Sequence, residues 1–166
     1  MRPSDPDLRA KVDEAEGWGD EVLQPLVRRV AWAALKRSKP AMLSYAQGSK
    51  FGLPDFLVSL GTTPAAYIAS RFNNASDEVV SADLAALPGR LDRVDAWVEE
   101  GVLGGEQPNA ADLQIGSSLR LLLSFGDTRP LIEGRPCAVL PERGFKPLSG
   151  SVPAGVLPAA WIPARG

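Results

Sequence analysis

The stretch from residue 101 to residue 125 constrains the fold of this chain more than any other. It reads GVLGGEQPNAADLQIGSSLRLLLSF, a glycine-rich loop followed by a helix with almost no charge. Asn109 can accept the amide hydrogen of the third helical residue, and Asp112 can reach back to the amide of Asn109. We therefore predict a structural capping box at Asn109 and Asp112. The helix is so apolar that we expect apolar neighbours to surround it at the centre of a bundle.

The chain before this loop also has the pattern of helices. Residues 5–40 predict one long helix that bends at Pro25 and ends at Pro40, because proline lacks an amide hydrogen and disrupts a helix interior. The residues that follow are less regular. We expect two short helices there, within residues 52–61 and 62–74.

Leucine and valine recur at helical spacing over residues 84–98, and a Pro-Gly pair at 88–89 is expected to kink or restart that helix. After the apolar helix, Asp127 is expected to cap a short turn, and residues 135–145 to form a last short helix. No segment alternates apolar and polar residues with the period of two that a half-buried strand requires. The predicted fold class is therefore all-α, a helical bundle.

Residues 146–166 differ from the rest of the chain. They contain four prolines, which exclude a continuous helix, together with several apolar side chains. We predict a helical domain over residues 1–145 and an extended strap over 146–166 that packs on the bundle, with Trp161 as its anchor.

Charge and composition narrow the classes of partner and compartment. Eighteen basic and twenty acidic residues give a net charge of −2, which offers no basic field for nucleic acid. No apolar window is long enough for a membrane span, and the first residues lack the pattern of a signal peptide. A single cysteine fits a reducing compartment. We therefore expect a cytoplasmic protein with no nucleic acid and no membrane as partner.

The residue types present also limit the chemistry. The chain has no histidine, the commonest general base and metal ligand, so we assign no catalytic residue and no metal site. Cys137 has no histidine to activate it and is interpreted as a small buried side chain. Arg120 lies within the apolar helix, where an unpaired charge is costly, and is predicted to pair with a carboxylate.

Several of these segments carry a resemblance to a known family. The stretch LPGRLDRVDAWVEEGVLGGEQPNAADLQIGSSLRLLL followed by RPLIEGRPCA resembles the C-terminal helical domain of glutathione transferases, in which a glycine loop precedes a capping box that opens the central helix. DPDLRAKVDEAEGWGDEVLQP is similar to the family's interdomain linker and first C-terminal helix. The resemblance spans about residues 5–145 and implies a glutathione transferase C-terminal-like bundle. Asn109 replaces the usual serine or threonine of the box.

The resemblance also implies a function and a missing half. In this family an N-terminal thioredoxin-like domain binds the co-substrate glutathione and activates its thiol, and that half is expected to be removed, separately encoded or never present. The chain would then be the substrate-binding half of an enzyme that adds glutathione to a small hydrophobic electrophile, inactive when isolated. The alternative is a non-catalytic protein-interaction module with the same fold. A thioredoxin-like domain, a partner chain or a second copy in a homodimer is the expected partner.

Four residues of the first long helix are candidates for a substrate pocket or a domain interface. On a regular helix Trp18, Val22, Arg29 and Trp32 share one face. Arg29 between the two tryptophans is expected either to point into a pocket for an acidic or aromatic substrate, or to lay its stem on apolar surface with its head in water. The resemblance implies that Trp18 and Val22 face the absent domain or the substrate, as an apolar patch that a partner or a second copy covers.

Overall fold

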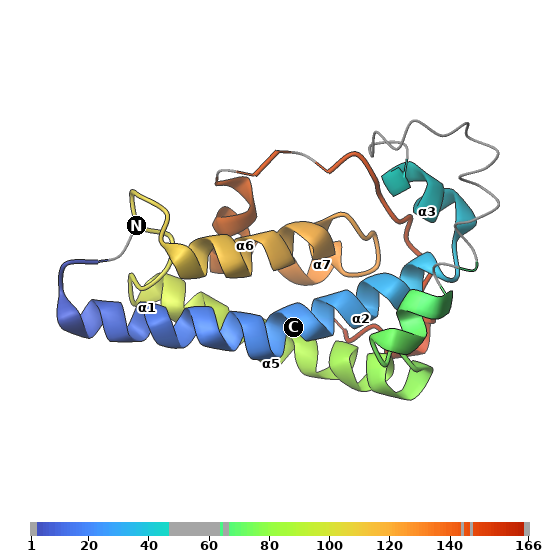
Figure 1. The fold of residues 1–166 in the computed structure, drawn as a ribbon, viewed down its shortest axis with the longest axis horizontal. Helices are drawn as coiled ribbons and strands as arrows, with labels where there is room; N and C mark the ends of the chain where they lie inside the picture. The colour runs from blue at the N-terminus through green and yellow to red at the C-terminus, as the bar shows by residue number, and fades with distance from the viewer. Residues whose placement is uncertain (1–2, 47–63, 65–66, 144, 147, 165–166) are drawn as a thin grey trace.

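The computed structural model describes residues 3–46, 64, 67–143, 145–146 and 148–164, and it shows helices packed side by side (Figure 1). Within these residues there is no strand, and the one pair with strand-like bridging joins Phe125 to Val152. The all-α prediction is therefore confirmed for the described part of the chain. The elements are α1 (Pro6–Trp18), η1 (Gly19–Leu23), α2 (Gln24–Leu35), α3 (Lys39–Ala46), α5 (Asp77–Glu99), α6 (Ala110–Leu123), α7 (Arg129–Ile132), η2 (Pro136–Glu142) and η3 (Ala159–Trp161).

α1, η1 and α2 follow one another as one long helix with a π-helical turn in its middle. The amide of Gln24 donates to the carbonyl of Gly19, five residues back, which is the hydrogen bond of a π-helix. The wider turn lies directly before Pro25, whose ring would clash with the carbonyl four residues earlier in a regular α-helix. Pro25 is therefore accommodated by a π-helical turn, and the bend expected at this residue stays a prediction.

The end of this long helix corrects one prediction. α2 ends at Leu35, and the expected end at Pro40 is wrong because Pro40 lies in the first turn of α3. Proline fits the first turn of a helix, where its missing amide hydrogen has no intrahelical partner to lose. Of the two short helices expected next, the one at 52–61 lies outside the described residues, and residues 67–72 of the other are helical.

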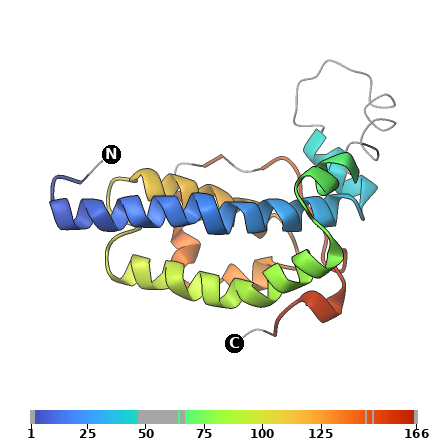
Figure 2. The same ribbon diagram turned by 60° about the horizontal axis from the view of Figure 1, so that its bottom comes forward.

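α5 runs through Pro88 as one helix of 23 residues, so the helix does not restart at that point. Figure 2 shows its course beside α1 and α2. The core lies between these helices and α6. Its largest fully buried side chains include those of Leu23, Leu84, Leu87, Leu91, Ile115, Leu119 and Leu122.

Charged pairs connect α1 and α2 to α5 along one seam. The seam consists of Lys11–Glu100, Glu14–Arg93, Arg29–Asp83 and Lys36–Asp77, with nitrogen–oxygen distances of 2.9, 2.7, 2.6 and 3.1 Å. Because residue numbers rise on one side of the seam as they fall on the other, α5 is antiparallel to α1 and α2. Most of these side chains are exposed to solvent, so each such pair contributes little stability.

The segment after η2 runs in an extended form over the end of α6 (Figure 1). The amide of Gly126 donates to the carbonyl of Val152 at 2.8 Å, and the amide of Val152 donates to Ser124 at 2.9 Å. A Cβ atom at Gly126 would lie 2.5 Å from the backbone nitrogen of Ala154, so only glycine fits there. Val152 and Leu157 are buried, whereas Trp161 is only partly buried.

Asp127 holds this segment instead of capping a helix. Its two carboxylate oxygens accept the amide hydrogens of Gly155 and Leu157 at 2.6 and 2.9 Å. The residue at the N-cap of α7 is Thr128, whose side chain makes no capping hydrogen bond. The predicted capping role of Asp127 is therefore wrong, because the nearby extended chain supplies two donors to its carboxylate. Residues 136–142 form a short 3₁₀-helix within the range expected for the last helix.

Candidate functional site

The capping box joins the glycine loop to the start of α6. The side chain of Asn109 accepts the amide hydrogen of Asp112 at 3.0 Å, and a carboxylate oxygen of Asp112 accepts that of Asn109 at 2.8 Å. The other oxygen of Asp112 accepts the amide hydrogen of Gly104 at 2.7 Å, where φ is +77°. The Asn109 side-chain amide donates to the carbonyl of Val102 at 2.9 Å. The box therefore fixes the loop as well as the helix.

Trp18 packs against α5. Its ring meets that of Trp97 edge to face, with 5.3 Å between the ring centroids. The guanidinium of Arg93 lies 4.7 Å from the Trp97 ring and 6.0 Å from the Trp18 ring, and it also pairs with Glu14. Trp18 is therefore held by contacts within the chain that combine aromatic and cation–π attraction.

Arg29 neither enters a pocket between the two tryptophans nor points freely into water. Its Nε and Nη2 atoms donate to the two oxygens of Asp83 at 2.6 and 2.9 Å. This bidentate ion pair is partly buried. The hydrogen bond with Asp83 raises the pKa of Arg29 against the lowering effect of burial. The charged head of Arg29 therefore binds α5, a contact that neither expectation included.

The four candidate residues do not converge on one site. Trp18 and Arg29 contact α5 at Trp97 and Asp83, which are fourteen positions apart and so about 21 Å apart along the helix axis. Val22 lies in the π-helical turn and is partly buried. Trp32 is partly buried and packs against the core. The π-helical turn also breaks the regular spacing from which one shared face was predicted.

One side of α6 is open, which corrects the expectation that apolar neighbours surround this helix. Leu113, Ser117, Arg120 and Leu121 recur at helical spacing and are each exposed or partly exposed, and we call them the open face of α6. The side chain of Leu113 is 49% exposed. At the edge of the open face, the side-chain amide of Gln114 donates to the carboxylate of Asp20 in η1 at 3.3 Å. The opposite side of the helix is buried in the core.

Arg120 on this face has no ion pair or hydrogen bond with any described residue. Its predicted pairing with a carboxylate is wrong, because the side chain is partly exposed and water can solvate the charge. The open face thus carries one exposed leucine, one partly buried leucine that also packs against the core, a serine and an arginine with no partner among the described residues.

An arginine network between α5 and η2 was not predicted from the sequence. The Nε atom of Arg135 donates to Asp95 at 2.7 Å, and Nη2 pairs with both Asp92 and Asp95. The second oxygen of Asp95 accepts the amide hydrogen of Cys137 at 2.8 Å. The Arg-Pro dipeptide at 135–136 lies within the stretch RPLIEGRPCA that carries the resemblance, and nothing in its spacing indicates partners forty residues earlier.

The described side chains offer little for covalent catalysis. Cys137 is buried as predicted, and burial, followed by its contacts with Asp95, raises the pKa of its thiol to about 12. A thiol with that pKa is protonated at neutral pH and is a poor nucleophile. Over the residues with defined positions, no group of three or more acidic or cysteine side chains is placed to hold a metal ion.

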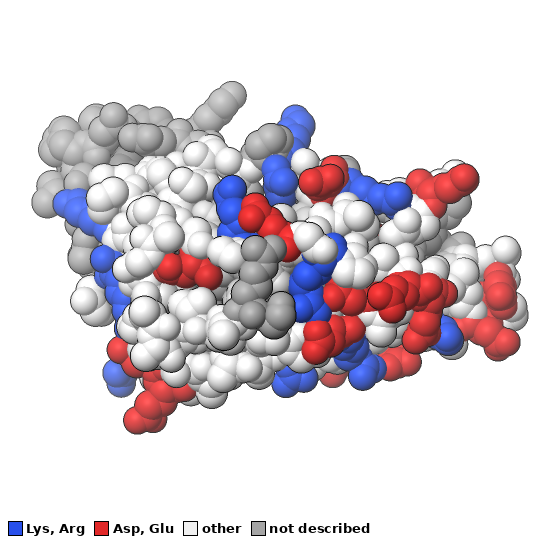
Figure 3. All heavy atoms as spheres, turned by 180° about the vertical axis from the view of Figure 1, so that it is seen from behind, with Lys and Arg blue, Asp and Glu red and all other residues white. Residues whose placement is uncertain are grey.

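The surface is mixed in charge. Seen from behind, acidic side chains gather over the end of the bundle where α1 begins and α5 ends, with lysine and arginine among them (Figure 3). None of the helices in the described ranges has both the length and the apolar character that crossing a membrane requires.

Comparison with known proteins gives no match: no protein-family model, no curated protein and no solved structure matches this chain. The likeness to glutathione transferases therefore rests on the sequence motifs.

Proposed function

We propose that this chain is the helical half of a glutathione transferase-like protein, and that a thioredoxin-like domain docks on the open face of α6. The complete protein adds glutathione to a small hydrophobic electrophile. In it the helical half forms walls of the electrophile site, and the thioredoxin-like half binds glutathione and activates its thiol.

The single observation that carries this proposal is the open face of α6. On one side α6 is buried in the core, and on the other it presents Leu113, part of Leu121 and Arg120 to solvent. Arg120 has no ion pair or hydrogen bond with a described residue. A covering domain would bury the two leucines, and an acidic group on that domain would pair with Arg120. Trp18 and Arg29 contact α5, which supports our choice of α6 and the neighbouring edge of η1 for the docking surface.

The test is affinity capture of the tagged chain from its own source cells, followed by identification of the bound chains by mass spectrometry. We expect a chain with a thioredoxin-like domain. Leu113→Glu and Arg120→Glu should each reduce the recovery of that chain at least tenfold. The first replaces an exposed leucine of the open face with a charged residue, and the second reverses the charge at position 120. Val139→Glu is the matched control, since Val139 is 43% exposed and lies on η2.

The purified pair should then conjugate glutathione to an aryl halide, and neither chain should do so alone. Recovery of no thioredoxin-like chain, or equal recovery by wild type and both α6 variants, would contradict the proposal.

A different exposed surface favours the second candidate, a non-catalytic interaction module. Tyr67, Ile68 and Phe72 lie on the helical segment 67–72 with 61, 57 and 87% of their side chains exposed. Large apolar side chains this exposed are suited to burial by another protein. If Phe72→Ser, and not Leu113→Glu, abolishes capture, and the captured chain has no thioredoxin-like domain, the interaction module is the correct function.

A further inference from the structure

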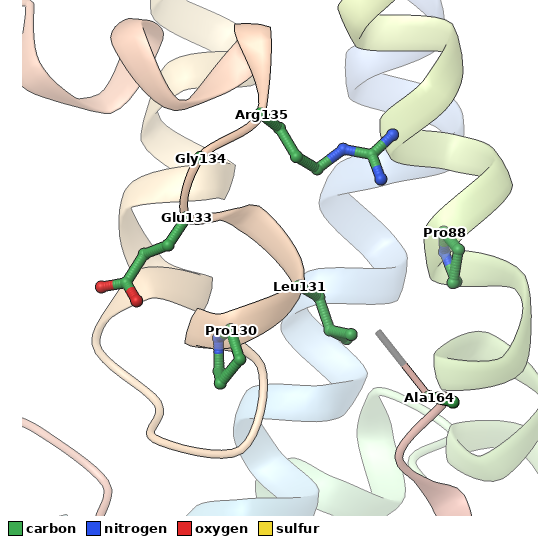
Figure 4. A pocket seen from close by; sticks show the side chains of 7 residues that line it. All are labelled: Pro88, Pro130, Leu131, Glu133, Gly134, Arg135 and Ala164. Atoms are coloured by element: carbon green, nitrogen blue, oxygen red, sulfur yellow. The ribbon is translucent and has the colours of Figure 1, made fainter. Parts of the chain in front are cut away.

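A small pocket lies between α5, α7 and the end of the chain, away from the residues of the open face. Its volume is about 250 Å³. It is lined by Pro88, Pro130, Leu131, Glu133, Gly134, Arg135 and Ala164 (Figure 4). Pockets for drug-sized ligands measure roughly 300–1,000 Å³, so this one suits a smaller molecule.

Arg135 supplies the polar group that faces this pocket. Figure 4 shows its guanidinium above the space between Leu131 and Pro88, whereas the carboxylate of Glu133 points away from both. The Nε and Nη2 atoms, which form one edge of the guanidinium, bind Asp92 and Asp95. Nη1 has no partner among the described residues, and its N–H groups remain available as donors to a molecule in the pocket.

The charge around Arg135 decides which molecules fit. One guanidinium is paired with two carboxylates, so the local charge is already negative before a ligand enters. An anion would be repelled by that excess, and a cation, which carries no acceptor, could not accept a hydrogen bond from Nη1. A neutral molecule avoids both costs and can still accept a hydrogen bond from Nη1.

The opposite walls are apolar. Pro88 lies within α5, Leu131 lies on α7, and Ala164 is the last described residue of the strap. A flat ring or short alkyl group can lie against these side chains while a polar end points to Arg135. Because Ala164 belongs to the strap, undocking of the strap would remove that part of the lining.

We infer that this pocket binds a small neutral molecule with an apolar ring and one carbonyl or amide oxygen, which accepts a hydrogen bond from Arg135. This site is separate from the docking face of α6, so its test does not depend on the proposed enzyme. The pocket requires a ligand that has a hydrogen-bond acceptor, a ring and a small size. These requirements define a class of ligand and not a single compound.

The experiment uses three probes of similar shape: neutral N-phenylacetamide, the anion phenylacetate and the cation phenethylammonium. Each is titrated into the isotope-labelled full chain, and backbone amide shifts are followed by NMR. We expect N-phenylacetamide to shift the amides of Leu131, Gly134 and Ala164 with a Kd on the order of 1 mM, as is usual for so small a ligand. Each charged probe should bind at least fivefold more weakly.

Ala164→Trp tests the location, because it places a large side chain in the pocket at an exposed position. It should abolish the shifts, whereas Ala160→Trp, at another exposed strap position, should leave them unchanged. Contacts between the ring protons of N-phenylacetamide and the Leu131 methyl groups, measured on the wild type, test the site without any variant. Shifts that map elsewhere, survive Ala164→Trp, or are stronger for phenylacetate would overturn the inference.

Discussion

Asp112 holds two parts of the chain together through one carboxylate, which accepts amide hydrogens from Asn109 and Gly104. Its side chain is almost fully buried. Asp112→Ala should therefore lower the free energy of unfolding by about 2 kcal/mol, because one buried and one partly buried amide lose a charged acceptor. Chemical denaturation measures the change, and Asp112→Asn, which keeps one side-chain oxygen, should lose less. An Asp112→Ala chain as stable as the wild type would remove the anchoring role.

Cys137 should react slowly with thiol reagents in the folded protein. Its pKa is raised from 9.0 to about 12, so the thiolate fraction at pH 8 is about one in ten thousand when folded and about one in ten when unfolded. Labelling should be at least a hundredfold faster in denaturant than in buffer, and a colorimetric thiol assay measures both rates. The folded-state rate should rise with pH up to about 12. Fast labelling of the folded chain at pH 8 would show an exposed, activated thiol.

At the scale of single residues, the sequence predicts what local spacing controls. Asn109 and Asp112 are three positions apart, and their hydrogen bonds follow from that spacing alone. Trp18 and Arg29 are different, because their partners Trp97 and Asp83 are far along the chain and become neighbours only after α5 packs. Arg120 was wrongly paired because the sequence does not show which side of α6 is uncovered.

At the scale of elements, the strap should contribute to stability. It buries Val152 and Leu157 and is tied to Asp127 by two hydrogen bonds. Ending the chain after Phe145 should lower the free energy of unfolding by at least about 2 kcal/mol, since burying one such side chain contributes about 1.5–3 kcal/mol before the cost of ordering. The measurements are a denaturation curve and the binding of an apolar dye.

Limited proteolysis of the intact chain gives the control for this prediction. Cleavage within residues 148–164 should be slow in the wild type and faster in Asp127→Ala, which removes the acceptor of two strap amides. A truncated chain that unfolds like the wild type, together with rapid cleavage of the intact strap, would mean that the strap adds nothing to the bundle.

Elements were predictable where their ends carry local signals. α6 begins where its capping box predicts, and helices were expected over most of α1, α2 and α5. The end of α2 at Leu35 was not predictable, because no proline or glycine marks it and Pro40 gives a stronger signal nearby. The π-helical turn was missed for a related reason: the sequence shows that Pro25 disturbs the helix but not how the turn before it adjusts.

At the scale of the whole molecule, one side of the central helix α6 is exposed or partly exposed to solvent, and on the proposed function a partner domain covers it. On the proposed function, the groups that bind glutathione and lower the pKa of its thiol belong to the partner domain. We therefore expect the isolated chain to show no conjugation of glutathione to an aryl halide above the uncatalysed rate, measured by absorbance of the product. If the pure chain turns over substrate and this activity persists through a second purification, the groups that bind and activate glutathione do not belong to a partner domain alone.

Gly126 limits how this sequence can vary. Any side chain at this position would push against the backbone of Ala154, which cannot move aside as the tip of a flexible side chain does. Position 126 lies in the bundle and not in the strap. A docked strap therefore constrains which residue the bundle can have at this position, in addition to the sequence of the strap itself. In a library of single variants screened for folding, glycine alone should persist at position 126 in full-length chains. In chains that end at Phe145, other residues should become acceptable there.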